Sequence, residues 1–288
     1  MILIMNIEVG PADHLTSYRK IAIASWRHPR DPSTYSWMDF PIEEAEKFLA
    51  SRSTDIPATM THFVALALAD CFRKQPEFDR LISFGRVYPR KSTDAFITTL
   101  LRDKKGKDLT GFVLRDINKM SLSEVAAQSA RETEKLRKGE DPEMESVKKK
   151  VGFLPAAILR VVFAIQEFVA YTLNQDPRIL GMPKDRFGSF MISNIGALGL
   201  ERGLIPLSPY SRCPVIIGLG KPREAPVVRE GEIVVAKVMT VSMTFDHRIA
   251  DGVQGAFVLR RLEKIFARPE AFPEVFAAAE DSQDVLPG

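Results

Sequence analysis

Cysteine is scarce in this chain, with only Cys71 and Cys213 among 288 residues. Two cysteines in a chain of this length do not supply the disulfide framework on which small secreted proteins depend. We therefore expect a reducing compartment and a cytoplasmic protein. Cys213 precedes Pro214 and an apolar strand-like stretch. This position favours a packing role over that of a nucleophile.

An excess of charge of one sign is also missing. Forty basic residues stand against 37 acidic ones, which gives a formal net charge of +3. So balanced a composition carries no argument for nucleic-acid binding. The apolar start, residues 1–5, is very short and lacks a basic flank, so it does not indicate a signal peptide. With 45% hydrophobic residues, the chain can bury the core of one large domain or of two small ones.

Long apolar runs are rare, and the exception is residues 153–173. These 21 residues are long enough to cross a bilayer. Arg160, Gln166 and Glu167 lie inside the run, and a charge at mid-bilayer costs about 2.5–3.5 kcal/mol, which disfavours a spanning helix. We expect an inserted helix that packs on the core or on a neighbouring subunit. A helix lying on a membrane surface, helped by the preceding lysines 148–150, is the alternative.

Shorter patterns predict helices and strands that alternate along the chain. Apolar spacing and turn residues predict helices at 18–26, 42–50, 61–72 and 121–137, and strands at 34–40, 87–88, 95–101 and 110–114. Ser121 and Glu124 have the spacing of a capping box. Residues 226–228 and 233–235 flank the turn of a hairpin. Together these elements predict an α/β or α+β protein with a mixed sheet flanked by helices.

The most informative segment is Phe245–Gly252, with the sequence FDHRIADG. It follows a stretch, 238–245, that alternates like a half-buried strand, and it precedes a helical pattern that starts at Val253. Histidine is the side chain best suited to proton transfer near neutral pH, so His247 at such a junction is a candidate catalytic base. A purely structural interpretation is also open. Asp251 and Gln254 have the spacing of a capping box, and His247 would then be an ordinary histidine at a strand end.

Three ordered motifs resemble the acyltransferase (E2) subunits of 2-oxo acid dehydrogenases, which share a fold with chloramphenicol acetyltransferase. The first motif is HRIADG at 247–252, the second is FMISNIG at 190–196, and the third is SYRKIA at 17–22. Ser193 and His247 are 247 − 193 = 54 residues apart, close to the spacing expected in the family. The resemblance is strong over 180–288 and moderate over 14–135. It implies a single catalytic domain over 1–288, an acyltransferase sandwich in which residues of about 138–180 form an inserted charged segment and apolar helix.

The resemblance also implies roles for individual residues. His247 would remove the proton of the attacking thiol, and Ser193 would donate its hydroxyl to the tetrahedral oxyanion. Asp251, the third residue of the candidate catalytic set, would hold the loop of the histidine by pairing with Arg19. Support of the turns is expected from three further residues, Asn194, Gly196 and Gly252. No metal is expected.

The implied substrate is coenzyme A or its acyl thioester, with a dihydrolipoyl-type thiol or another small molecule as acceptor. The match begins near His14, so we expect no covalently attached lipoyl group in this chain. The family further implies a homotrimer with active sites between subunits, and contacts with lipoyl-bearing proteins or dehydrogenase subunits. The chain after Pro269 is not the apolar tail expected of an E2 core, which puts assembly of trimers into a large shell in doubt.

Two other functions remain open at this point. The chain could be a non-catalytic, E2-like assembly protein of a dehydrogenase complex, or a detoxifying acetyltransferase of the chloramphenicol type. The complete set of motif residues favours the acyltransferase. Several basic residues are candidates for binding the phosphates of coenzyme A, but for each of them a solvent-exposed surface charge is the favoured interpretation. These candidates are Lys184, Arg186, Lys221 and Arg223.

Overall fold

A mixed sheet is the centre of the molecule. The structure is a computed structural model that describes residues 8–17, 20, 31–52, 55–103, 106–138, 155–180, 184–208 and 211–278. Seven strands form the sheet in the order β1-β9-β7-β6-β4-β5, and β8 pairs with β9 beyond this path. Their bounds are β1 Ser33–Pro41, β4 Ala95–Asp103, β5 Gly106–Leu114, β6 Phe190–Asn194, β7 Val215–Leu219, β8 Arg223–Arg229 and β9 Glu232–Asp246. The predicted α/β architecture with a mixed sheet flanked by helices is confirmed.

The long strand β9 joins much of the sheet. It pairs antiparallel with β1, β7 and β8, whereas β6 runs parallel to both β4 and β7. The strand predicted over 238–245 is present, but the expectation that only one of its faces is buried is wrong. Thr240, Ser242 and Thr244 on the polar face are at most 3% exposed. The loop after β6 covers this face, and the Ser242 hydroxyl donates to the Gly203 carbonyl at 2.6 Å.

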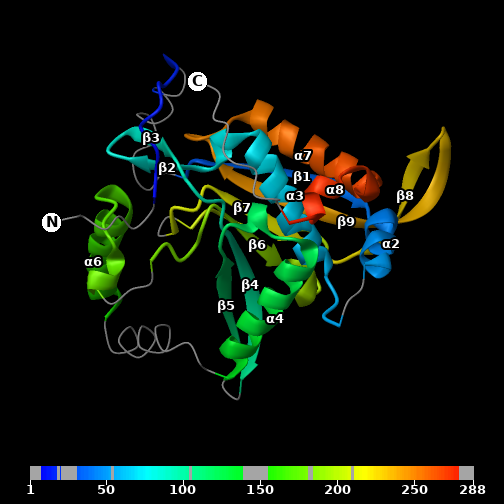
Figure 1. Cartoon of the computed structure of the whole chain (residues 1–288), viewed down its shortest axis with the longest axis horizontal. Coiled ribbons are helices and arrows are strands. Elements are labelled where there is room, and N and C mark those ends of the chain that lie inside the picture. Colours follow the sequence, from blue (N-terminus) through cyan, green and yellow to red (C-terminus); the bar gives the residue numbers. More distant parts are fainter. Residues whose placement is uncertain are drawn as a thin grey trace.

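Helices α2, α3, α7 and α8 gather beside β1 and β9, and α4 lies along β4 and β5 (Figure 1). The helices have the bounds α2 Glu43–Ser51, α3 Met60–Lys74, α4 Leu122–Lys138, α7 Gly252–Ala267 and α8 Pro273–Phe276. Phenylalanines fill the space between these helices and the sheet. Phe63 of α3 lies 5.1 Å from the ring of Phe266 and 4.8 Å from that of Phe276. Each fully buried ring contributes about 1.5–3 kcal/mol, so this cluster fixes α7 on the sheet.

Helix α6, Ala156–Glu167, stands apart from the sheet at the left of Figure 1 and continues as a π-helical turn, η3, Phe168–Thr172. The helix expected in the apolar run is thus present from residue 156 onward, and residues 153 and 154 lie outside the described part. At its far end Ala170 and Tyr171 of η3 form a small buried apolar cluster with Leu81 of β2, Arg80–Ser83. Among the helices of the described residues, none has the length and hydropathy needed to cross a membrane.

Local predictions about caps and turns can be checked directly. Ser121 and Glu124 form the predicted capping box, since the Ser121 backbone N–H donates to Glu124 at 2.7 Å and the Ser121 hydroxyl accepts from the Glu124 N–H at 3.3 Å. The hairpin between β8 and β9 turns at Glu230 and Gly231, whose φ angles of 53° and 86° suit a tight hairpin turn. The strand predicted at 87–88 belongs to β3, Arg86–Pro89, which pairs with β2. The predicted helix at 18–26 falls almost entirely outside the described residues.

Candidate active site

A tight turn between β9 and α7 carries His247. Asp246 ends β9, and its backbone N–H donates to the carbonyl of Pro214 at 2.9 Å. Its carboxylate accepts from Arg248 at Nε, at 3.0 Å, and at Nη2, at 2.6 Å. Such a bidentate pair is both strong and directional, and Asp246 is only 6% exposed. Asp246 and Arg248 therefore hold the backbone of the turn on both sides of His247.

His247 itself is fixed at its backbone and at its ring. Its backbone N–H donates to the carbonyl of Pro32 at 2.9 Å. Nδ1 lies 2.9 Å from the carbonyl oxygen of Ala250, and this oxygen can only accept a hydrogen bond. Nδ1 therefore carries the proton, and in the neutral ring the lone pair is at Nε2. This is the tautomer that a general base needs if the substrate approaches from the Nε2 side.

Asp251 caps helix α7, as the structural interpretation of its spacing predicted. One carboxylate oxygen accepts from the Val253 N–H at 2.9 Å, and the Asp251 N–H donates to the Gln254 side chain at 2.8 Å. The predicted partner Arg19 lies outside the described residues, so that ion pair stays a prediction. Gly252 is the first residue of α7, and a β-carbon there would meet no atom within 4 Å. The structure thus offers no steric reason for glycine at this position.

The second motif lies on β6 and the turn that follows it. Ser193 is half-buried on this central strand and pairs with Gly218 of β7. The Asn194 side chain accepts from the Ala197 N–H at 3.1 Å and caps the short helix η5, Ile195–Leu198. Gly196 lies where two backbone segments touch, because a β-carbon there would be 2.7 Å from the Lys221 nitrogen. The two residues thus shape the turn that follows the serine.

The structure does not bring Ser193 and His247 together within one chain. Gly218 pairs with Ser242 of β9, so Ser193 and Ser242 stand level, two strand spacings apart. His247 lies five residues beyond Ser242, toward the opposite end of the sheet. With about 4.8 Å between strands and about 3.4 Å per residue, Ser193 and His247 are roughly 20 Å apart. This separation far exceeds hydrogen-bonding reach, so any chemistry that uses both side chains needs two copies of the chain.

Sequence reasoning missed the ion pairs that support the histidine end of the sheet. Arg212 has a φ of 50° and pairs with Glu167 of α6 at 2.5 Å. Deeper in the molecule, the buried Arg90 pairs with Asp185 and lies near Asp79. Burial raises the pKa of Asp79. The adjacency of Asp246 and Arg248 within the motif was a usable signal, whereas the partners of Arg90 and Arg212 are distant in sequence.

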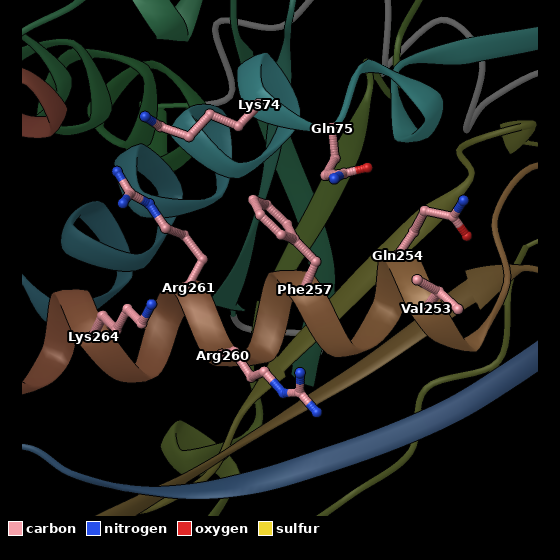
Figure 2. A pocket seen from close by; sticks show the side chains of 8 residues that line it. All are labelled: Lys74, Gln75, Val253, Gln254, Phe257, Arg260, Arg261 and Lys264. Carbon is pink, nitrogen blue, oxygen red and sulfur yellow. The ribbon is translucent and has the colours of Figure 1, made fainter.

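A pocket of about 440 Å³ lies beside the start of α7 (Figure 2). In this view Arg261 reaches toward Lys74 at the end of α3, and the ring of Phe257 points toward Gln75. Arg261 is held by the buried Asp70, at 2.9 Å, and by the ring of Phe272, 4.5 Å away. None of the candidate catalytic residues lines this pocket, so we assign it no part in the chemistry. The lining residues are Lys74, Gln75, Val253, Gln254, Phe257, Arg260, Arg261 and Lys264.

Both cysteines are buried, in agreement with a packing role. Burial raises the pKa of Cys71, and it raises the pKa of Cys213 to about 12. A thiol with so high a pKa supplies almost no thiolate near neutral pH, so neither residue suits a nucleophile. Arg223, one of the basic candidates for coenzyme A, is engaged by Asp39 at 2.8 Å. The structure therefore adds no support for Arg223 as a phosphate ligand.

Comparison with known proteins gives a family match that spans both motifs. A model of the family "2-oxoacid dehydrogenases acyltransferase (catalytic domain)" matches residues 182–273, which include Ser193, His247 and Asp251. The acetyltransferase component of the pyruvate dehydrogenase complex of Staphylococcus aureus is 35% identical over 79 residues. This match covers 27% of the present chain and 18% of the relative, so the chain accounts for less than a fifth of that protein's length. A Staphylococcus epidermidis relative matches to the same extent.

Solved structures show the same fold over nearly the whole chain. The dihydrolipoamide acetyltransferase of Azotobacter vinelandii superposes with a TM-score of 0.62 over 93% of this chain and 94% of that one, at 18% identity. A probable dihydrolipoamide acetyltransferase from Listeria monocytogenes gives a TM-score of 0.61 over 90% and 95%, at 12% identity. Residues 182–273 therefore resemble the catalytic domain of the 2-oxoacid dehydrogenase acyltransferases, and the described part of the chain has the fold of the two solved acetyltransferases.

Proposed function

We propose that this protein transfers an acyl group between coenzyme A and a thiol of the dihydrolipoyl type, with His247 as general base. The observation that carries the proposal is the Nδ1 contact of His247 with the Ala250 carbonyl. It holds the ring in one tautomer on a turn that Asp246 and Arg248 clamp.

In the proposed reaction, Nε2 of His247 takes the proton of the acceptor thiol. Free thiols have a pKa near 8.5, so an adjacent base raises the thiolate fraction where it is needed. The thiolate sulfur then bonds to the carbonyl carbon of the acyl thioester, and the negative charge moves to the carbonyl oxygen. The Ser193 hydroxyl donates to this oxyanion. When the intermediate collapses, its original carbon–sulfur bond breaks, and the departing thiolate takes the proton back from His247.

The site of this reaction lies between two copies of the chain. The roughly 20 Å between Ser193 and His247 within one copy supports this arrangement, because neither side chain can span that distance. Family resemblance favours a homotrimer, in which each histidine faces the serine of the neighbouring copy. Related catalytic domains form the cubic core of the pyruvate dehydrogenase complex and a core from Thermoplasma acidophilum. Here we propose trimers in the cytoplasm, built from a single catalytic domain over 1–288.

Asp251 has a positioning role in this proposal. The structure of the Azotobacter vinelandii enzyme was determined to study a serine, a histidine and an asparagine in its catalytic mechanism, and this asparagine follows the histidine by four positions. Asp251 follows His247 by the same interval. Asparagine and aspartate cap helices about equally well, so either residue can hold the start of α7. The additional negative charge of Asp251 would then serve the predicted pair with Arg19.

The direct test is thiol release from a panel of acyl-CoAs with dihydrolipoamide as acceptor. We expect transfer by the wild type and a loss of about 10²–10⁴-fold for His247→Ala, with unchanged circular dichroism. Ser193→Ala should lose about 10²–10³-fold through kcat, because the hydroxyl acts on the transition state. Absence of transfer with every donor would contradict the proposal and favour an assembly protein. Transfer to chloramphenicol but not to dihydrolipoamide would instead support the detoxifying enzyme.

A further inference from the structure

The pocket between the end of α3 and α7 is strongly basic. Four of its eight lining side chains are cationic, namely Lys74, Arg260, Arg261 and Lys264, and no acidic side chain is among the lining residues that the structure describes. Its volume of about 440 Å³ lies within the range of small-molecule sites, roughly 300–1,000 Å³. The pocket is therefore large enough for a small molecule, and its charge selects an anion.

The cations of α7 are spaced so that they repel one another. Arg260 and Arg261 lie one turn before Lys264, at the i,i+4 and i,i+3 spacings at which like charges destabilise a helix. Within the described part of the chain, neither Arg260 nor Lys264 has an acidic partner. Figure 2 shows that Arg260 extends from the side of α7 away from α3, whereas Arg261 extends toward Lys74. An anion between α3 and α7 would relieve the repulsion between Arg261, Lys264 and Lys74.

Arg261 is held in place without a ligand. Its Nε donates to the buried Asp70 at 2.9 Å, and its Nη2 lies 2.8 Å from the same carboxylate oxygen. Its guanidinium carbon lies 4.5 Å from the centre of the Phe272 ring. Among the described residues, Nη1 of Arg261 donates no hydrogen bond. A bound anion therefore meets a fixed guanidinium that still has a donor to offer.

The acids around the pocket do not balance its cations. Asp70 is shared, because Arg73 donates to it at 2.6 Å and Lys74 lies 3.9 Å from it. Glu274 lies 3.6 Å from Arg261, and its side chain is 47% exposed. In the ion pairs of the described residues, two carboxylates thus face five cations, the four that line the pocket and Arg73. The excess of positive charge exceeds what one carboxylate of a ligand would neutralise.

The remaining lining residues are uncharged. The half-buried Phe257 points its ring toward Gln75 in Figure 2, and Val253 lies one turn before it on α7. The side-chain carbonyl of Gln254 accepts from the Asp251 N–H at 2.8 Å, which leaves its NH₂ group to donate to a ligand. An aromatic ring flanked by two amides suits an uncharged, ring-bearing body and not a second anionic group.

We propose that this pocket binds a small organic phosphate, whose phosphate group lies within reach of Lys74, Arg261 and Lys264 and whose uncharged body lies against Phe257. A phosphate monoester carries about −1.5 to −2 charges at pH 7 and has three acceptor oxygens, one for each of these cations. A single carboxylate has half that charge and two oxygens. The site is separate from the proposed acyl transfer, because no candidate catalytic residue lines it.

Calorimetric titration of the full chain with phenyl phosphate tests the site. This probe joins one phosphate group to one ring, whereas inorganic phosphate and phenol each supply only one of the two parts. At low ionic strength we expect phenyl phosphate to bind saturably and more tightly than either part alone. Its binding should weaken as salt is added, because salt screens the exposed lysines.

Substitutions in the pocket separate the two ends of the ligand. Lys74→Gln and Lys264→Gln each remove one charge from an exposed side chain, so the fold should tolerate them. Each should weaken binding of phenyl phosphate about 2–5-fold, and both together about 5–20-fold. Phe257→Leu keeps an apolar side chain but removes the ring, so it should weaken binding of phenyl phosphate and leave that of inorganic phosphate unchanged. Lys135→Gln on α4, where the lysine side chain is 54% exposed, is the matched control and should bind like the wild type.

Four results would overturn the proposal. The first is the absence of saturable binding of phenyl phosphate up to about 10 mM, and the second is equal binding by the wild type and the double lysine variant. The third is an affinity for phenol or inorganic phosphate as high as that for phenyl phosphate. The fourth is displacement of the probe by coenzyme A, which would make the pocket a part of the acyl-transfer site. Binding of a phosphoserine peptide without binding of phenyl phosphate would replace the small molecule by a protein partner.

Discussion

At the scale of single residues, Gly196 and Gly252 of the motifs differ in how closely other atoms surround them. Gly196 allows the turn after β6 and the chain at Lys221 to approach each other, whereas Gly252 begins α7 with no atom near its β-carbon position. A methyl group at Gly196 would collide with backbone atoms, which cannot rotate away as a flexible side chain could. We expect Gly196→Ala to cost about 1–3 kcal/mol and to weaken transfer by displacing Ser193.

The matched control for this substitution is Gly252→Ala. Because nothing surrounds that position and its φ lies outside the left-handed region, alanine should stabilise the protein by about 0.4–1 kcal/mol through loss of entropy in the unfolded chain. Urea titrations of both variants measure the difference. Equal effects of the two substitutions on the free energy of unfolding would contradict the close approach at Gly196.

A residue-scale prediction about pH concerns His62 in the first turn of α3. Its Nδ1 accepts from the Thr59 N–H at 3.2 Å, so the ring must be neutral there, and burial lowers its pKa from 6.5 to about 4. The pKa of His62 is lower in the folded protein than in the unfolded chain. The neutral ring therefore stabilises the folded state fully above pH 6.5, and this stabilisation is lost as the pH falls toward 4. At about 1.4 kcal/mol per unit, this loss amounts to up to about 3 kcal/mol.

Substitution of His62 by glutamine isolates this effect. Glutamine at the same position can still accept from the Thr59 N–H, but it does not titrate. We therefore expect the free energy of unfolding of His62→Gln to vary less between pH 6.5 and 4 than that of the wild type. Denaturant titrations at several pH values measure this dependence. Parallel curves for the two proteins would show that His62 does not control it.

At the scale of elements, an ion pair between Arg212 and Glu167 joins α6 to the loop before β7. The side chains of Arg212 and Glu167 are 12% and 23% exposed, and burial lowers the pKa of Arg212. Removing the carboxylate would strand a mostly buried guanidinium. We expect Glu167→Ala to cost about 2–3 kcal/mol, somewhat less than for a fully buried pair. Limited proteolysis should then cut within α6 before the sheet unfolds.

A surface pair supplies the control for this prediction. Glu134 and Lys138 on α4 are 65% and 56% exposed, so Glu134→Ala should leave the free energy of unfolding almost unchanged. Thermal unfolding compares the two variants. If Glu167→Ala proved as harmless as Glu134→Ala and left α6 resistant to protease, the helix would be held by other contacts.

The helices and strands near the site differ in how well they could be predicted from the sequence. The strand at β9, the helix α7 and the capping residue Asp251 follow from local periodicity and spacing, so they were predictable. Burial of both faces of β9 was not, because the loop that covers Ser242 comes from 39 residues earlier in the chain. The exposure of the apolar side of α6 could not be predicted from the sequence either. An apolar stripe on a helix has the same pattern whether its partner is the same chain or another one.

At the scale of the whole molecule, strand order determines how the site is completed. The sequence motifs predicted both Ser193 and His247, and only the sheet register revealed that they lie at opposite ends of β6 and β9. Spacing along a chain carries no information about which strands become neighbours, so this separation could not be derived from the 54 residues between them. The resemblance had implied a site between subunits, and the register supports it by an independent physical argument.

The most direct test of the account mixes His247→Ala chains with Ser193→Ala chains. Each variant alone should be inactive, because every site lacks either its base or its oxyanion donor. After joint unfolding and refolding in equal amounts, half of the chains carry an intact histidine and half an intact serine. Random pairing in a ring then gives an intact site at about a quarter of the interfaces, so about a quarter of the wild-type rate should return. A mixture that stays inactive, while wild type treated in the same way recovers, would contradict an active site shared between two copies.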